Sequence, residues 1–389
     1  MQNYLLIILP LFAAIIAVFL LHPQMVNIAK LKGIVDNPDA RKLQKEPVPI
    51  LGGVVVFFGI FFSVACTHGL QDCSSLYLIF STMLIMLYAG TMDDILNLSP
   101  YVRFGVQIVA ICMLIFMGGY KLNDFHGLWG IYYIPDVISI PLTIFAAVGV
   151  INAINLIDGV DGLSTGFCIQ ACIIFGTVFY ISKVNPALII LAIATIGALI
   201  PVLLHNVFGI KSKMFIGDGG SLTLGLIMAV FLIQIIHSPH VKDVLTDEGY
   251  SPIAFTLAVL SIPVFDTLRV MVTRMLKHQS PFHPDKTHLH HLFIELGCSH
   301  IITTLCVLWL NMMVLLIWVI TCYCGASADV QVYVVLLTSI LFTTGIYLSF
   351  KTLQRRSPAR FEKIIDFNRK ARPRREGVFL TLQKLMDRM

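Results

Sequence analysis

Charge is scarce in this chain. Asp, Glu, Lys and Arg together make up 13% of its 389 residues, whereas soluble globular domains contain about 25%. Hydrophobic residues make up 57%, and the mean hydropathy is +0.85. This composition excludes a soluble globular protein and indicates an integral membrane protein that sits in a lipid bilayer.

Several other features are missing. The sequence contains no internal repeat, no low-complexity tract and no polar region long enough to form a separate soluble domain. Its nine cysteines follow no spacing typical of a disulfide framework. The basic residues near the end of the chain favour the anionic inner leaflet of a membrane over nucleic acid. We therefore expect an integral membrane domain at 1–350 and a basic cytoplasmic tail at 351–389.

Long apolar stretches fill the rest of the chain. Eleven of them are long enough to cross a hydrocarbon core about 30 Å thick. They are 4–21, 51–68, 76–92, 101–118, 137–154, 163–181, 187–205, 219–237, 252–275, 301–322 and 330–350. These runs lack the alternating pattern of a membrane β-barrel, and backbone groups in lipid need helical hydrogen bonds. The sequence predicts an all-α polytopic membrane protein with about eleven transmembrane helices.

The positions of Lys and Arg predict the orientation of these spans. If the loop at 22–50 faces the cytoplasm and the spans alternate, 24 of the 27 basic residues lie on the cytoplasmic side. The positive-inside rule then places the N-terminus outside and the C-terminus inside. We expect the first apolar stretch to stay in the protein, because no basic residue precedes it and no small-residue cleavage site follows it.

Four short polar clusters interrupt the apolar chain. They are MDD ending at Asp94, NLIDGVDGLS at 155–164, FIGDGGS at 215–221 and HPDKTHLHH ending at His291. In the predicted topology all four lie on the cytoplasmic face, which favours a single site. Carboxylates near a bilayer are costly, so a shared cation and a phosphorylated substrate would explain them.

The aspartates in these clusters have local interpretations as well. Adjacent Asp93 and Asp94 cannot point the same way on a helix, so one can hold a cation while the other faces a second ligand or a basic residue. A solvated helix cap is the alternative. Asp158 and Asp161 are each followed by glycine, which permits a tight turn beside a phosphate or a base. Asp218 precedes a glycine pair where a span begins, and a helix N-terminus can bind phosphate there.

The histidine cluster is open to three interpretations. His288, His290 and His291, with Lys286 beside them, could bind zinc, could neutralise an anion or could form a polar loop without a role. Their spacing fits no standard zinc site, so contact with phosphate is favoured. Asp266 lies deep in an apolar stretch and is expected to pair with Arg269 or with a neighbouring helix.

The four motifs, in this order and on these loops, carry a specific resemblance. MDDILNLSP, NAINLIDGVDGLS, FIGDGGSLTLG and SPFHPDKTHLHHLF resemble the polyprenyl-phosphate N-acetylhexosamine-1-phosphate transferases, the superfamily that includes the WecA and MraY enzymes. The HxHH pattern resembles the branch that begins O-antigen, common antigen or teichoic acid linkage units, and not the peptidoglycan branch with three consecutive histidines. In that branch an arginine usually occupies the position of Lys286.

The resemblance implies an activity and a setting. The family transfers GlcNAc-1-phosphate from UDP-GlcNAc to undecaprenyl phosphate and releases UMP, with Mg²⁺ as cofactor and Mn²⁺ as a substitute. It implies a multi-pass protein of the bacterial cytoplasmic (inner) membrane, with a homodimer as the family expectation. Another UDP-amino sugar, including UDP-MurNAc-pentapeptide, remains the alternative donor.

The resemblance also implies roles for residues. Asp218 is expected to bind Mg²⁺ together with Asp94, and Asp93 to orient or deprotonate the lipid phosphate. Asp158 and Asp161 are expected to serve the nucleotide and the catalytic centre. The remaining expected site residues are the catalytic His288, His290 and His291 and the substrate-binding Lys42, Lys45, Asn155, Asn206, Phe215 and Lys286.

Two other classes of protein fit the residues less well. An ion-coupled transporter places carboxylates near the bilayer midplane, often in repeated halves, whereas these clusters share one face and no repeat is visible. A structural scaffold would explain the spans but not the HPDKTHLHH segment. An enzyme therefore explains the sequence best, and we expect the membrane domain at 1–350 to be its catalytic domain.

Overall fold

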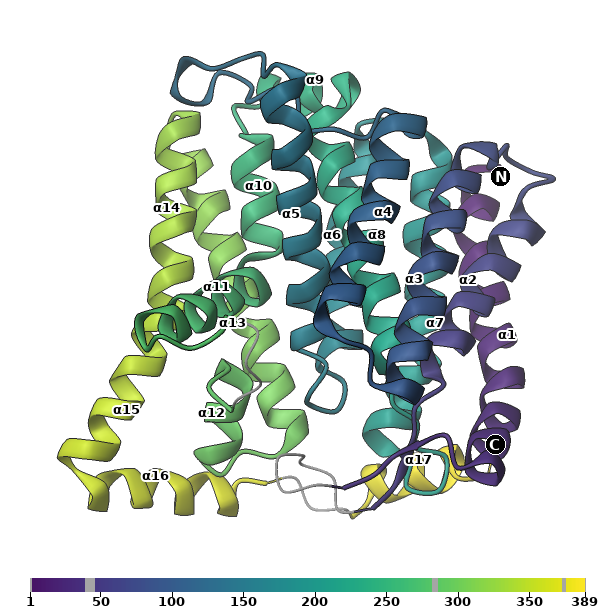
Figure 1. Ribbon diagram of the computed structural model, residues 1–389, viewed down its shortest axis with the longest axis vertical. Helices are drawn as coiled ribbons and strands as arrows, with labels where there is room; N and C mark the ends of the chain where they lie inside the picture. The colour runs from purple at the N-terminus through teal and green to yellow at the C-terminus, as the bar shows by residue number, and fades with distance from the viewer. Residues whose placement is uncertain (1, 39–45, 282–285, 373–375, 389) are drawn as a thin grey trace.

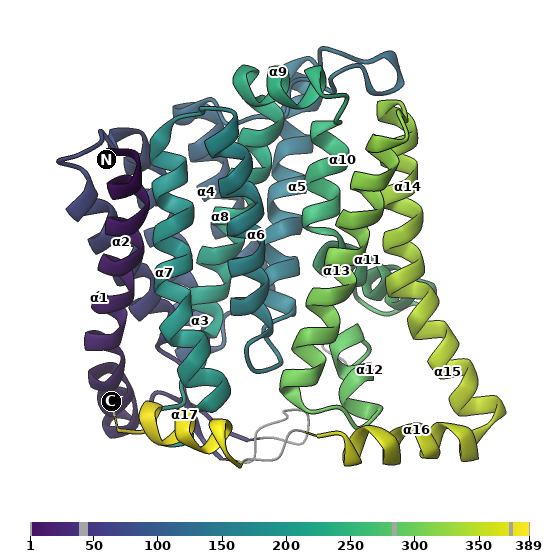
Figure 2. The same cartoon turned by 180° about the vertical axis from the view of Figure 1, so that it is seen from behind.

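The computed structural model describes residues 2–38, 46–281, 286–372 and 376–388. Long helices run side by side through the molecule, and several shorter ones lie at its two ends (Figure 1, Figure 2). The first eight helices are α1 (Gln2–Lys32), α2 (Gly52–Thr67), α3 (Tyr77–Leu96), α4 (Pro100–Gly118), α5 (Asp136–Leu156), α6 (Leu163–Ile181), α7 (Pro186–Phe208) and α8 (Gly217–His237).

The second half of the chain is also helical. It contains α9 (Pro239–Asp247), α10 (Pro252–Val259), α11 (Ser261–Leu276), α12 (Leu289–Glu295), α13 (His300–Tyr323), α14 (Ala328–Ile340), α15 (Ile346–Arg356), α16 (Pro358–Lys370) and α17 (Val378–Met386). The short elements are η1 (Ser74–Leu76), η2 (Leu128–Gly130), the π-helical η3 (Leu341–Gly345) and an antiparallel pair of strands, β1 (Val35–Asp36) and β2 (Val48–Pro49). The expected all-α membrane fold is confirmed apart from this small pair.

Helix lengths can be compared with the predicted spans. In the described part of the chain, nine helices are long and apolar enough to cross a membrane, or ten if the bent pair α10 and α11 counts as one span. The apolar helix α2 has 16 residues and is shorter. Each predicted stretch therefore coincides with a helix or with the bent pair. The protein is a multi-pass membrane protein.

The ninth predicted span is broken where a straight helix was expected. The axes of α10 and α11 differ by 76° across Leu260. Asn311 of α13 satisfies the backbone at the break: its Oδ1 accepts hydrogen bonds from the N–H of Ile262 (3.1 Å) and the hydroxyl of Ser261 (2.9 Å), and its Nδ2 donates to the carbonyl of Val259 (2.9 Å). Because the freed polar groups have partners, the break is tolerated inside the bundle.

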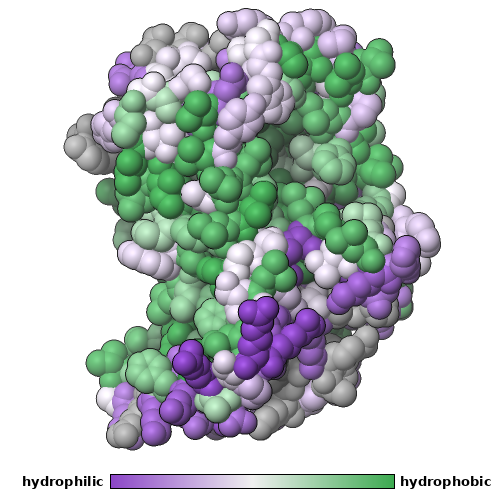
Figure 3. Space-filling model, turned by 90° about the vertical axis from the view of Figure 1, so that its left-hand side faces the viewer, coloured by the Kyte–Doolittle hydropathy of each residue, from purple (hydrophilic) through white to green (hydrophobic). Residues whose placement is uncertain are grey.

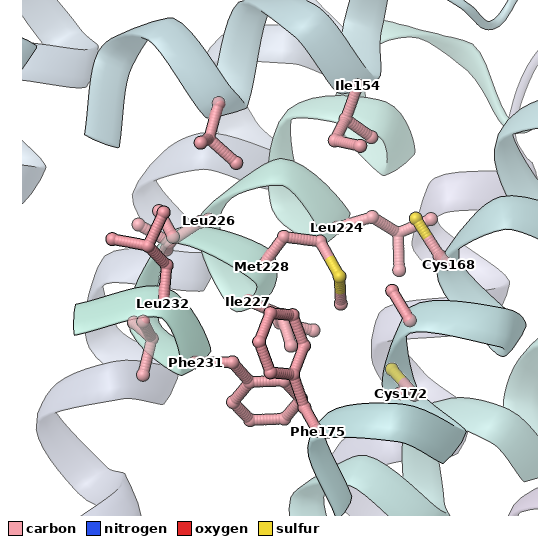
Figure 4. Packing of buried hydrophobic residues seen from close by; sticks show 14 of the residues in the cluster. Ile154, Cys168, Cys172, Phe175, Leu224, Leu226, Ile227, Met228, Phe231 and Leu232 are labelled. Atoms are coloured by element: carbon pink, nitrogen blue, oxygen red, sulfur yellow. The ribbon is translucent and has the colours of Figure 1, made fainter. Parts of the chain in front are cut away.

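Helix α8 is the centre of the bundle. Of its most apolar stretch, 94% is buried inside the protein, and it packs against α2, α3, α5, α6 and α10. Glycines allow the closest approaches, because a Cβ on Gly53 of α2 or on Gly90 of α3 would overlap the backbone of α8. Farther along, Met228 and Phe231 of α8 lie against Phe175 of α6 (Figure 4).

The outer surface fits a lipid environment. One face of the molecule is covered largely by apolar residues, and most of the strongly hydrophilic residues on that face lie in its lower half (Figure 3). Large apolar side chains such as Phe116, Phe145 and Leu305 are exposed on α4, α5 and α13. In a soluble protein such a surface would be an aggregation site, whereas in a bilayer it faces hydrocarbon.

The predicted tail returns to the body of the protein. Helices α16 and α17 lie across the lower end of the bundle (Figure 1, Figure 2). Lys351 forms an ion pair with Glu295 of α12 (2.7 Å), and the Asn368 amide donates to the carbonyl of Leu296 (2.8 Å). The tail is thus anchored to the end of the bundle that carries the polar clusters.

Candidate active site

A cavity of about 750 Å³ opens at the lower end of the bundle. It lies where α3 ends, where α4 and α8 begin, and at the turn between α5 and α6. Ten of the residues that the sequence predicted for the site line it: Asp93, Asp94, Asn155, Asp158, Asp161, Asn206, Phe215, Asp218, Lys286 and His291. Segments far apart in the chain therefore form one site.

The two adjacent aspartates point to different partners, as their spacing predicts. Asp93 is buried and accepts a hydrogen bond from Nη1 of Arg103 at 2.8 Å. The same Nη1 lies 3.7 Å from Oδ2 of Asp218. Arg103 therefore links the carboxylate at the end of α3 to the one at the start of α8, and its charge compensates for burying Asp93.

Asp94 faces the first turn of α8. Its Oδ1 accepts the N–H of Asp218 (3.1 Å) and its Oδ2 accepts the N–H of Gly219 (3.4 Å). A carboxylate at this position accepts hydrogen bonds from backbone N–H groups that have no partner within the helix, and the positive end of the helix dipole stabilises its negative charge. The contact needs the close approach of α3 to α8, which Gly90 allows.

Asn155, in the last turn of α5, fixes the side chain of Asp218. Its Nδ2 donates to Oδ1 of Asp218 (2.7 Å) and to the hydroxyl of Ser221 (2.9 Å). Oδ2 of Asp218 faces Arg103. The Asp218 carboxylate is thus oriented by Asn155 of α5 on one oxygen and by Arg103 of α4 on the other.

The turn between α5 and α6 holds its two aspartates in different environments. Asp158 accepts a hydrogen bond from the hydroxyl of Ser164. Burial raises the pKa of Asp158 well above its usual value, and the nearby Asp218 and Asp94 raise it further. In the free protein this carboxyl therefore favours its protonated form well above the pH at which an exposed aspartate ionises.

Asp161 has the opposite environment. Burial by itself would raise its pKa, but a hydrogen bond from His300 and the charge of Lys213 outweigh burial and lower it. Lys213 Nζ lies 2.6 Å and His300 Nδ1 2.9 Å from Oδ2 of Asp161. Asp161 is thus held as a carboxylate. The Lys213 ammonium also lies over the Phe215 ring, 5.4 Å from the ring centre.

The predicted histidines divide between the cavity and its wall. His291 lines the cavity, whereas His288 and His290 are buried and their rings stack 5.6 Å apart. Oδ2 of Asp266 lies 3.0 Å from Nδ1 of His288, and Oδ1 accepts from Arg269 at 2.6 Å, so the expected pairing of Asp266 is confirmed.

His290 supports the aspartate turn. A Cβ added to Gly159 would lie 3.2 Å from its Nε2, so the ring touches the backbone next to Asp158. Burial lowers the pKa of His290 well below its usual value, and the neighbouring His291 and His288 lower it further. This side chain is therefore neutral at physiological pH. Catalytic roles for His288 and His290 stay predictions.

Lys42 and Lys45 lie outside the described residues. The segment that follows them does reach the site. The N–H groups of Gly52 and Gly53 donate to the carbonyls of Phe215 (3.0 Å) and Ile216 (2.7 Å). These bonds fix the start of α8 and, with it, the cavity wall that Phe215 forms.

A divalent cation is compatible with this arrangement. Among the described residues, no group of three or more His, Cys, Asp or Glu side chains converges as a complete metal site. Mg²⁺ in phosphoryl-transfer sites uses only one or two protein carboxylates and completes its shell with waters and substrate phosphates. Asp94 and Asp218 meet at the start of α8 and supply such oxygen donors.

Comparisons with known proteins match the same region. The model of glycosyl transferase family 4 matches residues 76–236. Undecaprenyl-phosphate alpha-N-acetylglucosaminyl 1-phosphate transferase from Escherichia coli strain K12 is 31% identical over 276 residues, which are 70% of this chain and 72% of the relative. The chain belongs to glycosyl transferase family 4.

Other relatives of this family 4 protein carry similar names. The undecaprenyl-phosphate alpha-N-acetylglucosaminyl 1-phosphate transferase of Yersinia pestis is 31% identical over 272 residues, 68% of this chain and 70% of the relative. A probable undecaprenyl-phosphate N-acetylglucosaminyl 1-phosphate transferase of Bacillus subtilis is 28% identical over 299 residues, 76% of this chain and 79% of the relative.

Three residues of the candidate site were not predicted from the sequence. Arg103, Lys213 and His300 line the cavity and each contacts one of the predicted aspartates. In the sequence, Arg103 and Lys213 stand out only as two of the basic residues that predict orientation, because a single basic residue at the end of a span usually marks the cytoplasmic side. The aspartates themselves were a signal for these residues, because several carboxylates buried in one site require cations nearby.

Proposed function

We propose that this protein transfers GlcNAc-1-phosphate from UDP-GlcNAc to undecaprenyl phosphate, giving undecaprenyl-diphospho-GlcNAc and UMP. The observation that carries the proposal is the cavity itself, where nine residues predicted from four separate motifs come together with Asn206. The names of the relatives support the acceptor and the amino sugar. The cavity's mixture of carboxylates and basic groups suits a polyanionic substrate and a cation.

The proposed reaction exchanges one phosphate bond for another. An oxygen of the lipid phosphate forms a bond to the β-phosphorus of UDP-GlcNAc, the bond from that phosphorus to the bridging oxygen breaks, and UMP leaves with the electron pair. Mg²⁺, or Mn²⁺ in its place, would be held by Asp218 and Asp94 and would neutralise charge on the diphosphate. The lipid phosphate is largely dianionic at pH 7, so its oxygen needs little deprotonation.

The protein's own groups then position the two substrates. Lys286 and His291 line the cavity and supply positive or polar contacts for phosphate. Phe215 and Asn206 line it as an aromatic and an amide surface for the nucleotide. Arg103 Nη1 lies 2.8 Å from the Asp93 carboxylate, and we assign Asp93 to orienting the lipid phosphate. Asp93→Asn retaining most of its kcat at pH 8 would exclude this assignment.

The proposal includes the membrane setting. We propose eleven crossings of the bacterial inner membrane, with α2 as a short crossing, the α10 and α11 pair as one, and the N-terminus outside. The distribution of Lys and Arg supports this orientation and puts the cavity on the cytoplasmic face, where UDP-sugars are available. Labelling of single introduced cysteines from each side of the membrane tests it. A homodimer remains an expectation from the family, and cross-linking in membranes tests that expectation.

The direct test is an assay with the purified protein in detergent. We expect UMP release from UDP-GlcNAc that requires both undecaprenyl phosphate and Mg²⁺. Asp218→Asn is the matched inactive variant, since it keeps the size of the side chain and removes the charge. Release of UMP at the same rate without the lipid would contradict the proposed acceptor.

Donor specificity is tested in the same assay. UDP-GlcNAc, UDP-GalNAc and UDP-MurNAc-pentapeptide are supplied in parallel at equal concentrations. We expect the highest kcat/KM with UDP-GlcNAc. A preference for the pentapeptide donor would assign the protein to peptidoglycan synthesis instead.

A further inference from the structure

One carboxylate of the C-terminal tail is bound by the loop between α7 and α8. Asp387 follows α17, and its Oδ1 accepts the backbone N–H groups of Ile210 (3.0 Å), Lys211 (2.8 Å) and Ser212 (3.1 Å). The Ser212 hydroxyl donates to the same oxygen at 3.2 Å. Three consecutive N–H groups that converge on one oxygen form an anion-binding nest.

The tail is packed at this position as well as hydrogen-bonded. Helix α17 lies below the ends of α1 and α7 (Figure 1, Figure 2). The Phe379 ring contacts the Phe208 ring at the end of α7, with centroids 5.1 Å apart, and Met386 is buried. Burial alone would raise the pKa of Asp387, but the backbone N–H donors outweigh burial and lower it, so the side chain is a carboxylate.

The bound loop carries two residues of the cavity. Beyond Ser212 it continues into Lys213, which pairs with Asp161 at 2.6 Å, and then into Phe215. The end of the loop near α8 is fixed by backbone bonds to the segment at 49–53. The beginning of the loop is fixed differently, since the N–H groups of Ile210, Lys211 and Ser212 donate to Asp387.

Helix α1 completes the attachment. The Lys30 ammonium donates to the carbonyl of Lys211 (2.7 Å), and His22 Nε2 lies 2.8 Å from the carbonyl of Ser212. The His22 ring stacks on His205 of α7 at 4.0 Å. The loop is therefore attached in two ways: α1 binds its carbonyls, and the tail binds its N–H groups. Loss of the Asp387 side chain removes the acceptor for those N–H groups.

We propose that Asp387 is a positioning residue for binding of the sugar nucleotide. It holds the loop at 209–213 so that Lys213 stays against Asp161 at the cavity wall. This inference rests on the proposed function, because it assigns the cavity to UDP-GlcNAc. Asp387 lies outside the cavity lining, so its effect passes through the loop.

The experiment compares variants in the purified full-length protein. Asp387→Ala removes the acceptor, Asp387→Asn keeps the shape without the charge, and Asp387→Glu keeps the charge. Asp366→Ala is the matched control, because Asp366 is an exposed acidic residue of the same tail on α16. KM and kcat are measured with UDP-GlcNAc varied and, separately, with undecaprenyl phosphate varied.

We expect Asp387→Ala to raise the KM for UDP-GlcNAc about fivefold, the effect of losing hydrogen bonds to one charged group. The KM for the lipid should change by less than about twofold. Asp387→Asn should show a smaller rise, Asp387→Glu should recover at least part of the wild-type value, and Asp366→Ala should match wild type. Added UDP-GlcNAc should also raise Tm least in Asp387→Ala, more in Asp387→Asn, and as much as in wild type in Asp366→Ala.

Three results would overturn the proposal. One is an unchanged KM for UDP-GlcNAc in both the Ala and Asn variants. Another is a loss of kcat and thermal stability with no change in either KM, which would mean that the tail only stabilises the fold. The third is an equal effect of Asp366→Ala. Wild-type protein without any transferase activity would refute the proposed function instead, so the two failures are distinguishable.

Discussion

At the scale of single residues, each carboxylate in the cavity has its own partner. Asp93 has Arg103, Asp94 has the first turn of α8, Asp158 has Ser164, Asp161 has Lys213 and His300, and Asp218 has Asn155. These environments shift the pKa of Asp158 upward and that of Asp161 downward, although a glycine follows both. The division of roles among them therefore comes from neighbours that lie elsewhere in the chain.

Arg103 is the first of these neighbours to test. Arg103→Ala leaves Asp93 buried beside Asp218 without a cation, so we expect kcat to fall by at least about tenfold. Arg103→Lys should retain more activity because it keeps the charge. The control is Arg360→Ala on α16, an exposed arginine that should leave kcat unchanged. Wild-type kcat in Arg103→Ala would contradict a role for this ion pair.

Asp161 leads to a pH-dependent prediction. Its pKa is lowered in the folded protein, so its ion pairs stabilise the fold above the unfolded pKa of about 4, and that stabilisation is lost as pH falls. Asp161→Asn should lower Tm at pH 7, and the difference from wild type should shrink below about pH 4. Thermal unfolding monitored by tryptophan fluorescence measures both. A difference that grew as the pH fell would oppose this assignment.

At the scale of helices, contacts between glycine and backbone determine where the site residues lie. Gly53→Ala introduces a Cβ that overlaps the backbone of Gly220 in α8, and we expect a loss of about 1–3 kcal/mol of stability. Gly149→Ala in α5 is the matched control, since a Cβ there meets nothing within 4 Å. That substitution should be neutral or add about 0.5–1 kcal/mol. Equal Tm changes in the two variants would argue against close packing of α2 on α8.

The elements also show what the sequence could predict. Apolar length identified where the helices lie, because hydrocarbon thickness sets a simple requirement. It could not predict the break at Leu260, since 252–275 is long enough for one straight span and the polar group that stabilises the break, Asn311, belongs to another helix. Helix α1 likewise continues to Lys32, past the predicted end of its span, because Val26 and Ala29 pack into the core.

At the scale of the whole molecule, the prediction of one site was more successful than the prediction of its details. Topology and motif order were enough to bring Asp93, Asp158 and Asp218 to the same end, and the cavity contains all three. Arg103, Lys213 and His300 were not predicted as site residues, because only the folded chain shows which basic group meets which acid. The docking of Asp387 into the loop after α7 is a contact of the same kind.

The central claim is that the cavity transfers a sugar phosphate to a lipid phosphate, and the position of a label tests it most directly. Purified protein is incubated with undecaprenyl phosphate and UDP-GlcNAc that carries radioactive phosphorus at either the α or the β position. We predict that the β label enters the butanol-soluble lipid and that the α label leaves as UMP. A β label that stays with the nucleotide as UDP, or a lipid fraction without label, would contradict the account.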